Sequence, residues 1–96
     1  MAKGYWIGHV DVSNAENYPN YMKAAQPAYE KYGAKFIVRG GKFDSVEGKA
    51  RSRHVVVEFE SYEKALACYN SPEYQAAAKI RQANSEGDIL IVEGAE

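Results

Sequence analysis

Two hydrophobic periods alternate along the chain, and together they predict four strands separated by helices and a loop. Four runs are rich in β-branched and aromatic residues, which is typical of strands. These runs are residues 4–12 (GYWIGHVDV), 34–40 (AKFIVRG), 54–59 (HVVVEF) and 88–94 (DILIVEG). Two intervening segments instead carry apolar residues three and four positions apart, which favours helices.

The first helix is expected over residues 15–32, after Ser13 and Asn14, which can cap it. Pro27 does not fit a helix interior, because it has no N–H to donate and its ring strikes the carbonyl one turn earlier. We therefore expect a kink or a break at Pro27. Gly33 is expected to end the helix in a left-handed conformation.

The second half of the chain repeats the order of strand, serine-capped helix and strand. Ser61 is expected to begin a helix that runs to Tyr69. Ser71 then begins another helical segment that runs to about Asn84. The polar, glycine-bearing stretch 41–52 predicts a loop.

The resulting order, βαββαβ, is that of a ferredoxin-like α+β fold. It predicts a single domain over residues 1–96. Its four-stranded antiparallel sheet has the order 4-1-3-2, and the helices cover one face.

Side chains alternate between the two faces of a strand, so the strands define a helix-bearing face and an outer face. The helix-bearing face is expected to be the uniformly apolar one, with Trp6, Val10, Val12, Phe36, Val38, Val55, Val57, Phe59, Leu90 and Val92. The outer face is mixed and is expected to carry Tyr5, Ile7, His9, Ile37, Arg39, His54, Val56, Glu58, Ile89, Ile91 and Glu93. Such a face is too apolar to lie open to water. A second copy of the chain would cover it, so we expect a homodimer.

A register can be assigned by taking the first and third strands as parallel to each other. One row across the outer face then reads Glu93, Tyr5, His54 and Arg39, and another reads Ile89, His9, Glu58 and Lys35. We expect the Arg39 guanidinium to be partly buried in this row. Its expected partner is Glu58, Glu93 or a bound anion, because a covered charge is costly unless it is paired.

The composition and charge indicate which partners and which location to expect for the protein. The net charge is −1, from 12 basic and 13 acidic residues, so no basic field exists to bind nucleic acid or an anionic membrane. No apolar run approaches the roughly 20 residues of a membrane span, and the N-terminus lacks the pattern of a signal peptide. The single cysteine, Cys68, excludes an internal disulfide and favours a reducing compartment, so a cytoplasmic location is expected.

Several short motifs joined to this element order resemble a known family. They are Arg39-Gly40-Gly41, Glu58-Phe59 with Ser61, Ala65 and Tyr69, Ser71-Pro72-Glu73-Tyr74, Arg81, and Val92-Glu93-Gly94. Together they resemble a widespread bacterial family of small dimeric α/β-barrel proteins, known as a domain of unknown function, over nearly the whole chain. The resemblance implies a dimer whose two sheets pack into a barrel, and it implies no reaction. Distant relatives with this fold include cofactor-free monooxygenases, haem-degrading enzymes and dye-decolourising enzymes, but a fold does not fix a function.

The candidate catalytic residues are His9, His54 and Glu58, which could handle protons. A metal site is not expected, because His54 and Glu58 lie about 13 Å apart along one strand and cannot share an ion. The candidate ligand-binding residues are Arg39, Tyr5, Tyr69, Arg81 and Glu93. No cofactor motif is present, and Cys68 has no catalytic signature around it.

Two functions fit these residues. In the first, a cavity of roughly a few hundred Å³ binds or transforms a small organic molecule, with Arg39 holding an anionic or carbonyl group. In the second, the protein is a structural or binding dimer without chemistry, and its polar residues only fix the interface. The sequence names no substrate and does not decide whether the protein is an enzyme.

Overall fold

The computed structural model describes residues 2–95 and contains three helices and four strands. The elements are β1 (Gly4–Val12), α1 (Tyr18–Tyr32), β2 (Lys35–Arg39), β3 (Arg53–Phe59), α2 (Tyr62–Tyr69), α3 (Pro72–Asn84) and β4 (Ser85–Glu93). The predicted ferredoxin-like α+β fold is confirmed. The sheet order is β2-β3-β1-β4, which is the predicted 4-1-3-2 counted from the other edge.

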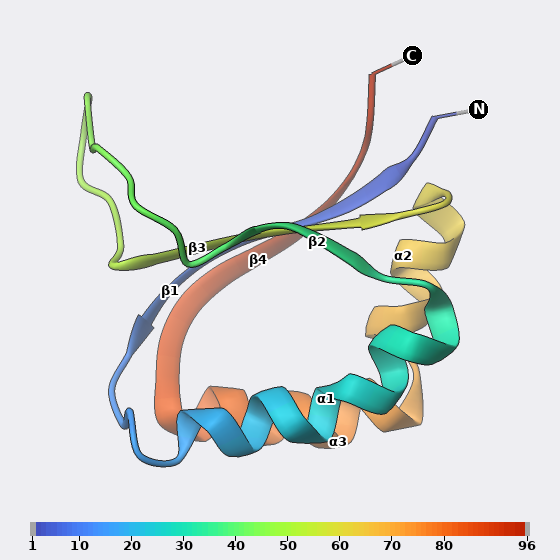
Figure 1. The fold of residues 1–96 in the computed structure, drawn as a ribbon, viewed down its shortest axis with the longest axis horizontal. Coiled ribbons are helices and arrows are strands. Elements are labelled where there is room, and N and C mark those ends of the chain that lie inside the picture. Colours follow the sequence, from blue (N-terminus) through green and yellow to red (C-terminus); the bar gives the residue numbers. More distant parts are fainter. Residues whose placement is uncertain (1, 96) are drawn as a thin grey trace.

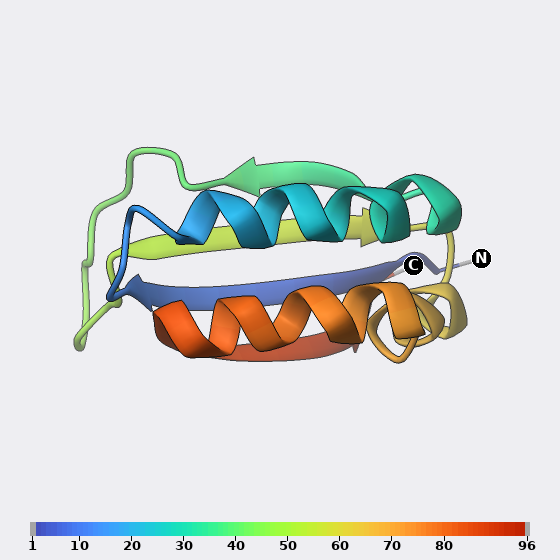
Figure 2. The ribbon, with the colours of Figure 1, turned by 90° about the horizontal axis from the view of Figure 1, so that it is seen from below.

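The molecule has two layers. Helices α1 and α3 lie side by side under one face of the sheet, and α2 stands at the end of the sheet where β3 ends (Figures 1 and 2). The other face of the sheet carries no helix (Figure 1). In the part of the chain described, no helix is both long enough and apolar enough to cross a membrane.

The predicted helix ends are confirmed at three positions. The Ser61 hydroxyl accepts a hydrogen bond from the Lys64 amide at 3.1 Å, and the Ser71 hydroxyl accepts one from the Tyr74 amide at 3.2 Å. Gly33 ends α1 with φ 69°, a left-handed conformation that glycine adopts without steric cost.

The expected break at Pro27 is absent, because α1 is continuous from Tyr18 to Tyr32. Its ribbon only bends toward the sheet in its second half (Figure 1). Pro27 is exposed, and buried Ala25, Ala28 and Tyr29 around it attach this part of the helix to the core. Tertiary packing therefore outweighs the local penalty of the proline.

The core lies between the sheet and the helices and is built around Trp6. The Trp6 ring is 4% exposed and lies within 6 Å, between ring centroids, of the rings of Tyr29, Phe59, Tyr69 and Tyr74. Its indole N–H donates to the Ala65 carbonyl at 2.9 Å, which satisfies the one polar atom of the buried ring.

The predicted register was wrong, because β1 and β3 are antiparallel. In a βαββαβ chain the third strand returns from a hairpin and must run against the first. Tyr5 therefore lies opposite Glu58, and His9 lies opposite His54. The two predicted rows exchange partners, and Glu93 pairs with Gly4 at the far end of the sheet from Arg39.

The predicted faces are correct for β1 and β3 and wrong for β4. The pairing of Tyr5 with Val92 and of Ile7 with Leu90 places Leu90 and Val92 on the outer face, where they are 51% and 40% exposed. Ile89 and Ile91 lie on the helix-bearing face, as does the exposed Glu93. Both sets of alternate positions in this strand are largely apolar, so the alternation alone could not orient it.

Arg39 was also assigned to the wrong face, because β2 contains an irregularity. Phe36 pairs with Val57 and Val38 pairs with Val56, so Ile37 is an extra residue between two consecutive positions of β3. A bulge of this kind reverses the alternation beyond it. Val38 therefore lies on the outer face, and Arg39, which pairs with Val55, lies on the helix-bearing face.

Candidate functional site

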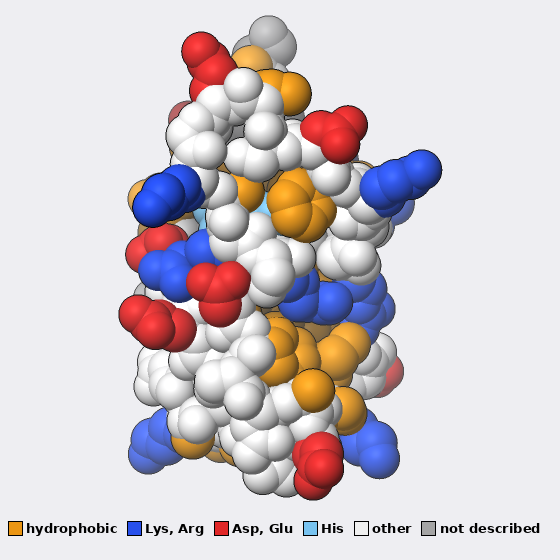
Figure 3. Space-filling model, turned by 90° about the vertical axis from the view of Figure 1, so that its left-hand side faces the viewer, with side chains coloured by type: hydrophobic (Ala, Val, Ile, Leu, Met, Phe, Trp, Pro, Cys, Tyr) orange, Lys and Arg blue, Asp and Glu red, His pale blue; other side chains and the backbone are white. Residues whose placement is uncertain are grey.

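A cavity lies between the sheet and helices α1 and α3, at the end of the molecule where α1 and β3 begin. It is lined mainly by aromatic and aliphatic side chains, among them Trp6, Tyr18, Tyr21, Phe36, Val55 and Tyr74. Seen from this end, Lys and Arg side chains lie beside hydrophobic side chains, with a hollow between them (Figure 3). The cavity volume is about 40 Å³, well below the few hundred Å³ expected. It accommodates one small chemical group, and a larger ligand would extend through the mouth.

Three arginines line this cavity, and each comes from a different element. Arg39 ends β2, Arg53 begins β3, and Arg81 lies in the last turn of α3. Their burial rises inward: Arg39 is exposed, Arg53 is half-buried, and Arg81 is only 7% exposed. No Asp or Glu is among the lining residues.

The guanidinium groups pack against aromatic rings. Arg39 lies 4.1 Å from the centre of the Phe36 ring, and Arg53 lies 5.8 Å from that of Tyr18. The side chain of Arg53 also lies against the backbone of Gly40, where a Cβ would meet its guanidinium nitrogen. Gly40 has φ 68°, a left-handed conformation that glycine adopts without steric cost, and a Cβ there would require the end of the Arg53 side chain to move.

Three tyrosine hydroxyls form a buried chain beside the cavity. The Tyr21 hydroxyl lies 3.0 Å from that of Tyr29 and 2.8 Å from that of Tyr74. Burial raises the pKa of all three phenols above its usual value, so they stay protonated at neutral pH. They can therefore donate hydrogen bonds but do not serve as bases.

The cavity contains only two of the predicted ligand-binding residues, Arg39 and Arg81. Tyr69 packs with its ring centroid 5.4 Å from that of Tyr74, in the core rather than at the cavity wall. Tyr5 lies on the outer face, and Glu93 lies at the opposite end of the sheet from Arg39. The sequence analysis missed Arg53 and Tyr21. Arg53 continues the alternation of Val55 and Val57, and this could have placed it on the helix-bearing face.

The predicted catalytic residues all lie on the outer face, where the two histidines pair with each other and Glu58 pairs with Tyr5 and Lys3. The Nδ1 atoms of His9 and His54 are 2.8 Å apart. The Tyr5 hydroxyl donates to Glu58 at 3.3 Å, and Lys3 approaches the same carboxylate at 3.8 Å. Arg39 does not reach Glu58 or Glu93 of its own chain, because it is exposed on the opposite face of the sheet, so the predicted pairing within one chain and the predicted partial burial were wrong.

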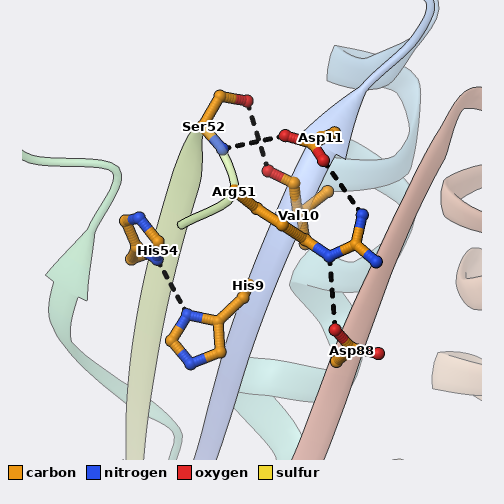
Figure 4. Close-up of polar contacts among 7 residues, drawn as sticks. All are labelled: His9, Val10, Asp11, Arg51, Ser52, His54 and Asp88. Carbon is orange, nitrogen blue, oxygen red and sulfur yellow. Dashed lines mark hydrogen bonds and ion pairs between the residues drawn. The ribbon is translucent and has the colours of Figure 1, made fainter. Parts of the chain in front are cut away.

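A second polar cluster holds the loop after β2 against the outer face (Figure 4). The Arg51 guanidinium bridges Asp11 on β1 at 2.9 Å and Asp88 on β4 at 3.2 Å. Asp11 also accepts the Ser52 amide N–H at 2.8 Å. This backbone hydrogen bond is the main reason that the pKa of the Asp11 carboxyl lies below its usual value. No local sequence pattern indicates this cluster, because it depends on the strand register.

Within residues 2–95, no group of three or more His, Cys, Asp or Glu side chains is placed to hold a metal ion. Cys68 is buried, and burial raises the pKa of its thiol to about 12. Its thiol is therefore not a nucleophile at neutral pH.

Residues 3–95 match the family described as domain of unknown function DUF1330. The chain belongs to this family. The resemblance inferred from the motifs is thereby confirmed. Comparison with curated proteins yields no match.

Several solved structures share the fold over almost the whole chain. A protein of unknown function from Rhodopseudomonas palustris has a TM-score of 0.79 and 18% identity, over 99% of this chain and 84% of that one. A dimeric ferredoxin-like protein of unknown function from Jannaschia has a TM-score of 0.71 and 16% identity, over 98% and 99% of the two chains. SnoaB, a cofactor-independent oxygenase from Streptomyces nogalater, has a TM-score of 0.65 and 8% identity, over 100% and 96%. At these identities the likeness shows a common fold and no common activity.

Proposed function

We propose that this protein binds a small organic molecule in the cavity between the sheet and the helices, as a homodimer formed through the outer face of the sheet. The observation that carries the binding proposal is the cavity itself: an apolar, aromatic wall with guanidinium groups that converge on it. A mostly apolar pocket with a few convergent polar groups is the usual form of a small-molecule site.

The outer face supports the dimer. Its apolar side chains Val38, Leu90 and Val92 are 40–51% exposed and lie around the half-buried Ile7 and Val56. In a single chain they would stay in contact with water, whereas packing of two such faces would bury them. The similar protein from Jannaschia is described as dimeric, which agrees with this arrangement.

In this proposal, the two functions suggested by the sequence use opposite faces of one sheet. The outer face serves assembly, and the helix-bearing face binds the ligand. On the outer face, His9 pairs with His54 and Tyr5 pairs with Glu58, and these pairs would fix the register of the dimer, although the Nε2 atom of His54 is buried without a partner. On the helix-bearing face, the three arginines form no ion pair within residues 2–95 and are available to an anionic ligand.

The binding proposal is tested by filling the cavity. Gly8 lines it, and a Cβ on Gly8 would meet only the Ile89 side chain at 3.5 Å, an ordinary contact. Gly8→Val should therefore fold and occupy the space. Gly41→Val is the matched control, because nothing lies within 4 Å of a Cβ there. Fluorescence of Trp6, the only tryptophan and a lining residue, reports binding in the cavity during titration with a small-molecule fragment panel.

The expected result is that fragments raise the melting temperature and change the Trp6 fluorescence of the wild type and of Gly41→Val, and do neither in Gly8→Val. A ligand bound only by the folded state must raise the melting temperature. Equal binding by Gly8→Val would place the ligand elsewhere, and the absence of any binding fragment would overturn the proposed function.

A further inference from the structure

The deepest charged group of the cavity lacks a counter-charge. Arg81 is 7% exposed, and no carboxylate among residues 2–95 forms an ion pair with it. Its Nε atom is buried without a hydrogen-bond partner. The Nε atom of Arg53, which lines the same cavity, is buried and unpartnered too.

A buried Nε–H without an acceptor is costly, because it loses its hydrogen bonds to water and the neighbouring tyrosines do not replace them at this atom. The guanidinium does not avoid this cost by losing its proton. Burial acts to lower the pKa of Arg81, but the Tyr74 and Tyr21 oxygens act against it and the pKa is raised overall, so the group stays charged. A buried charge with an unpartnered donor in a cavity is a candidate for binding an anion.

The arrangement of the three arginines indicates how an anion would enter. Exposed Arg39 and half-buried Arg53 lie toward the mouth, and Arg81 lies innermost. Positive charge along an apolar passage attracts anions and repels cations. The volume of about 40 Å³ limits what can reach Arg81 to a small group such as a carboxylate.

We propose that the ligand is an organic carboxylate whose charged group binds Arg81 inside the cavity and whose apolar body extends past Arg53 and Arg39 toward the mouth. This proposal rests on the proposed function. A carboxylate matches the guanidinium fork, because it can accept from Nε–H and a terminal N–H at once. An organic anion fits better than an inorganic one, because most of the cavity wall is apolar. Among the wall residues Tyr18, Phe36 and Val55, the Tyr18 hydroxyl is the one polar side-chain group.

The experiment compares acids with their neutral isosteres. Benzoate and benzamide, and propanoate and propanamide, are titrated into the full chain, with sulfate and phosphate at equal ionic strength as inorganic probes. Binding is measured by Trp6 fluorescence and by melting temperature. Arg81→Met removes the charge and keeps much of the side-chain length. Arg81→Lys keeps the charge without the forked guanidinium. Arg51→Met is the control, because it removes one positive charge on the outer face, away from the cavity.

We expect the carboxylates to bind and the amides not to bind. Loss of a charge-assisted pair should raise the Kd of Arg81→Met for benzoate by about tenfold or more, with Arg81→Lys between it and the wild type. Arg51→Met should bind benzoate as the wild type does. Because Arg81 has no carboxylate partner to strand, Arg81→Met without ligand should melt at the same temperature as the wild type or higher.

Other outcomes overturn the proposal in separable ways. If amides bind as well as acids and Gly8→Val abolishes their binding, the cavity is a ligand site that does not select a carboxylate. Sulfate or phosphate that binds as tightly as benzoate would make this an inorganic anion site. A marked loss of stability in both Arg81 variants would assign Arg81 a structural role. If no acid and no other fragment binds, the proposed function fails along with this inference.

Discussion

The guanidinium carbon of Arg81 lies 5.9 Å from the centre of the Tyr21 ring, deep on the helix-bearing side of the sheet. The charge is therefore surrounded by a tyrosine network and not by an acidic partner. On the outer face, in contrast, Arg51 binds two aspartates. This difference between two arginines of one small domain is the basis on which we propose a binding face and an assembly face.

A first prediction concerns assembly. Light scattering at micromolar concentration should give twice the 10.7 kDa mass of one chain. Leu90→Asp places a charge within the exposed apolar patch and should give the monomer mass. Ala76→Asp, on an exposed position of α3, is the control and should stay dimeric. A wild-type monomer would remove the basis for the two-sheet barrel.

A second prediction concerns the contact between β1 and β4. A Cβ on Gly87 would lie 2.4 Å from the His9 carbonyl oxygen and 2.9 Å from the Cα of Val10, both backbone atoms that cannot move aside cheaply. Gly87→Ala should lower the free energy of unfolding by about 1–3 kcal/mol, as overpacking does. Gly41→Ala has open space and should change it by less than about 0.5 kcal/mol. Urea denaturation measures both, and equal effects would contradict the close packing of these strands.

A third prediction concerns Pro27. It is exposed and interrupts the hydrogen bonds of a continuous α1, so Pro27→Ala restores a donor without loss of packing. The helix penalty of proline is about 3 kcal/mol, and the stiffer unfolded chain offsets up to about 1 kcal/mol of it. We expect the substitution to raise the free energy of unfolding by about 1–2 kcal/mol. A destabilised variant would show that the bend of α1 is needed for packing.

The proline also illustrates what the sequence could predict and what it could not. Periodicity and capping residues such as Ser61 and Ser71 located the helices, because these signals are local. The failure at Pro27 arose because burial of Ala25, Ala28 and Tyr29 outweighs a local penalty. Similarly, Arg39 was identified as a candidate but assigned to the wrong face, because a single extra residue at Ile37 cannot be detected from alternation alone.

The same limit applies to the site. Arg39 and Arg81 were selected by residue type, and both line the cavity. His9, His54 and Glu58 were grouped by a register in which β1 and β3 run parallel, so their true partners were missed. Alternation along β3 could have placed Arg53 on the helix-bearing face, but sequence spacing does not reveal that Arg53 and Tyr21 line one cavity, because they are brought together only by folding.

A fourth prediction concerns pH. The pKa of Asp11 is lowered in the folded protein, chiefly by the Ser52 amide and then by Ser52 and Arg51 side chains. Because the pKa of Asp11 is lower in the folded protein than the unfolded value of 3.8, the ionised carboxylate stabilises the fold above that value. This stabilisation is lost as the pH falls through the pKa of the folded protein. The melting-temperature difference between the wild type and Asp11→Asn should be constant from about pH 5 to pH 8 and shrink below about pH 4. A difference that changes between pH 5 and pH 8 would assign the effect to another group.

In the proposal made above, the helix-bearing face binds a carboxylate and the outer face does not. The most direct measurement is a nuclear magnetic resonance titration of the 15N-labelled protein with benzoate, which follows side-chain N–H signals. The Nε–H signals of Arg81 and Arg53 and the indole N–H of Trp6 should shift in a saturable manner, because all three side chains line the cavity. The ring signals of His9 and His54 should not move. Shifts at the two histidines with none at Arg81 would contradict the account.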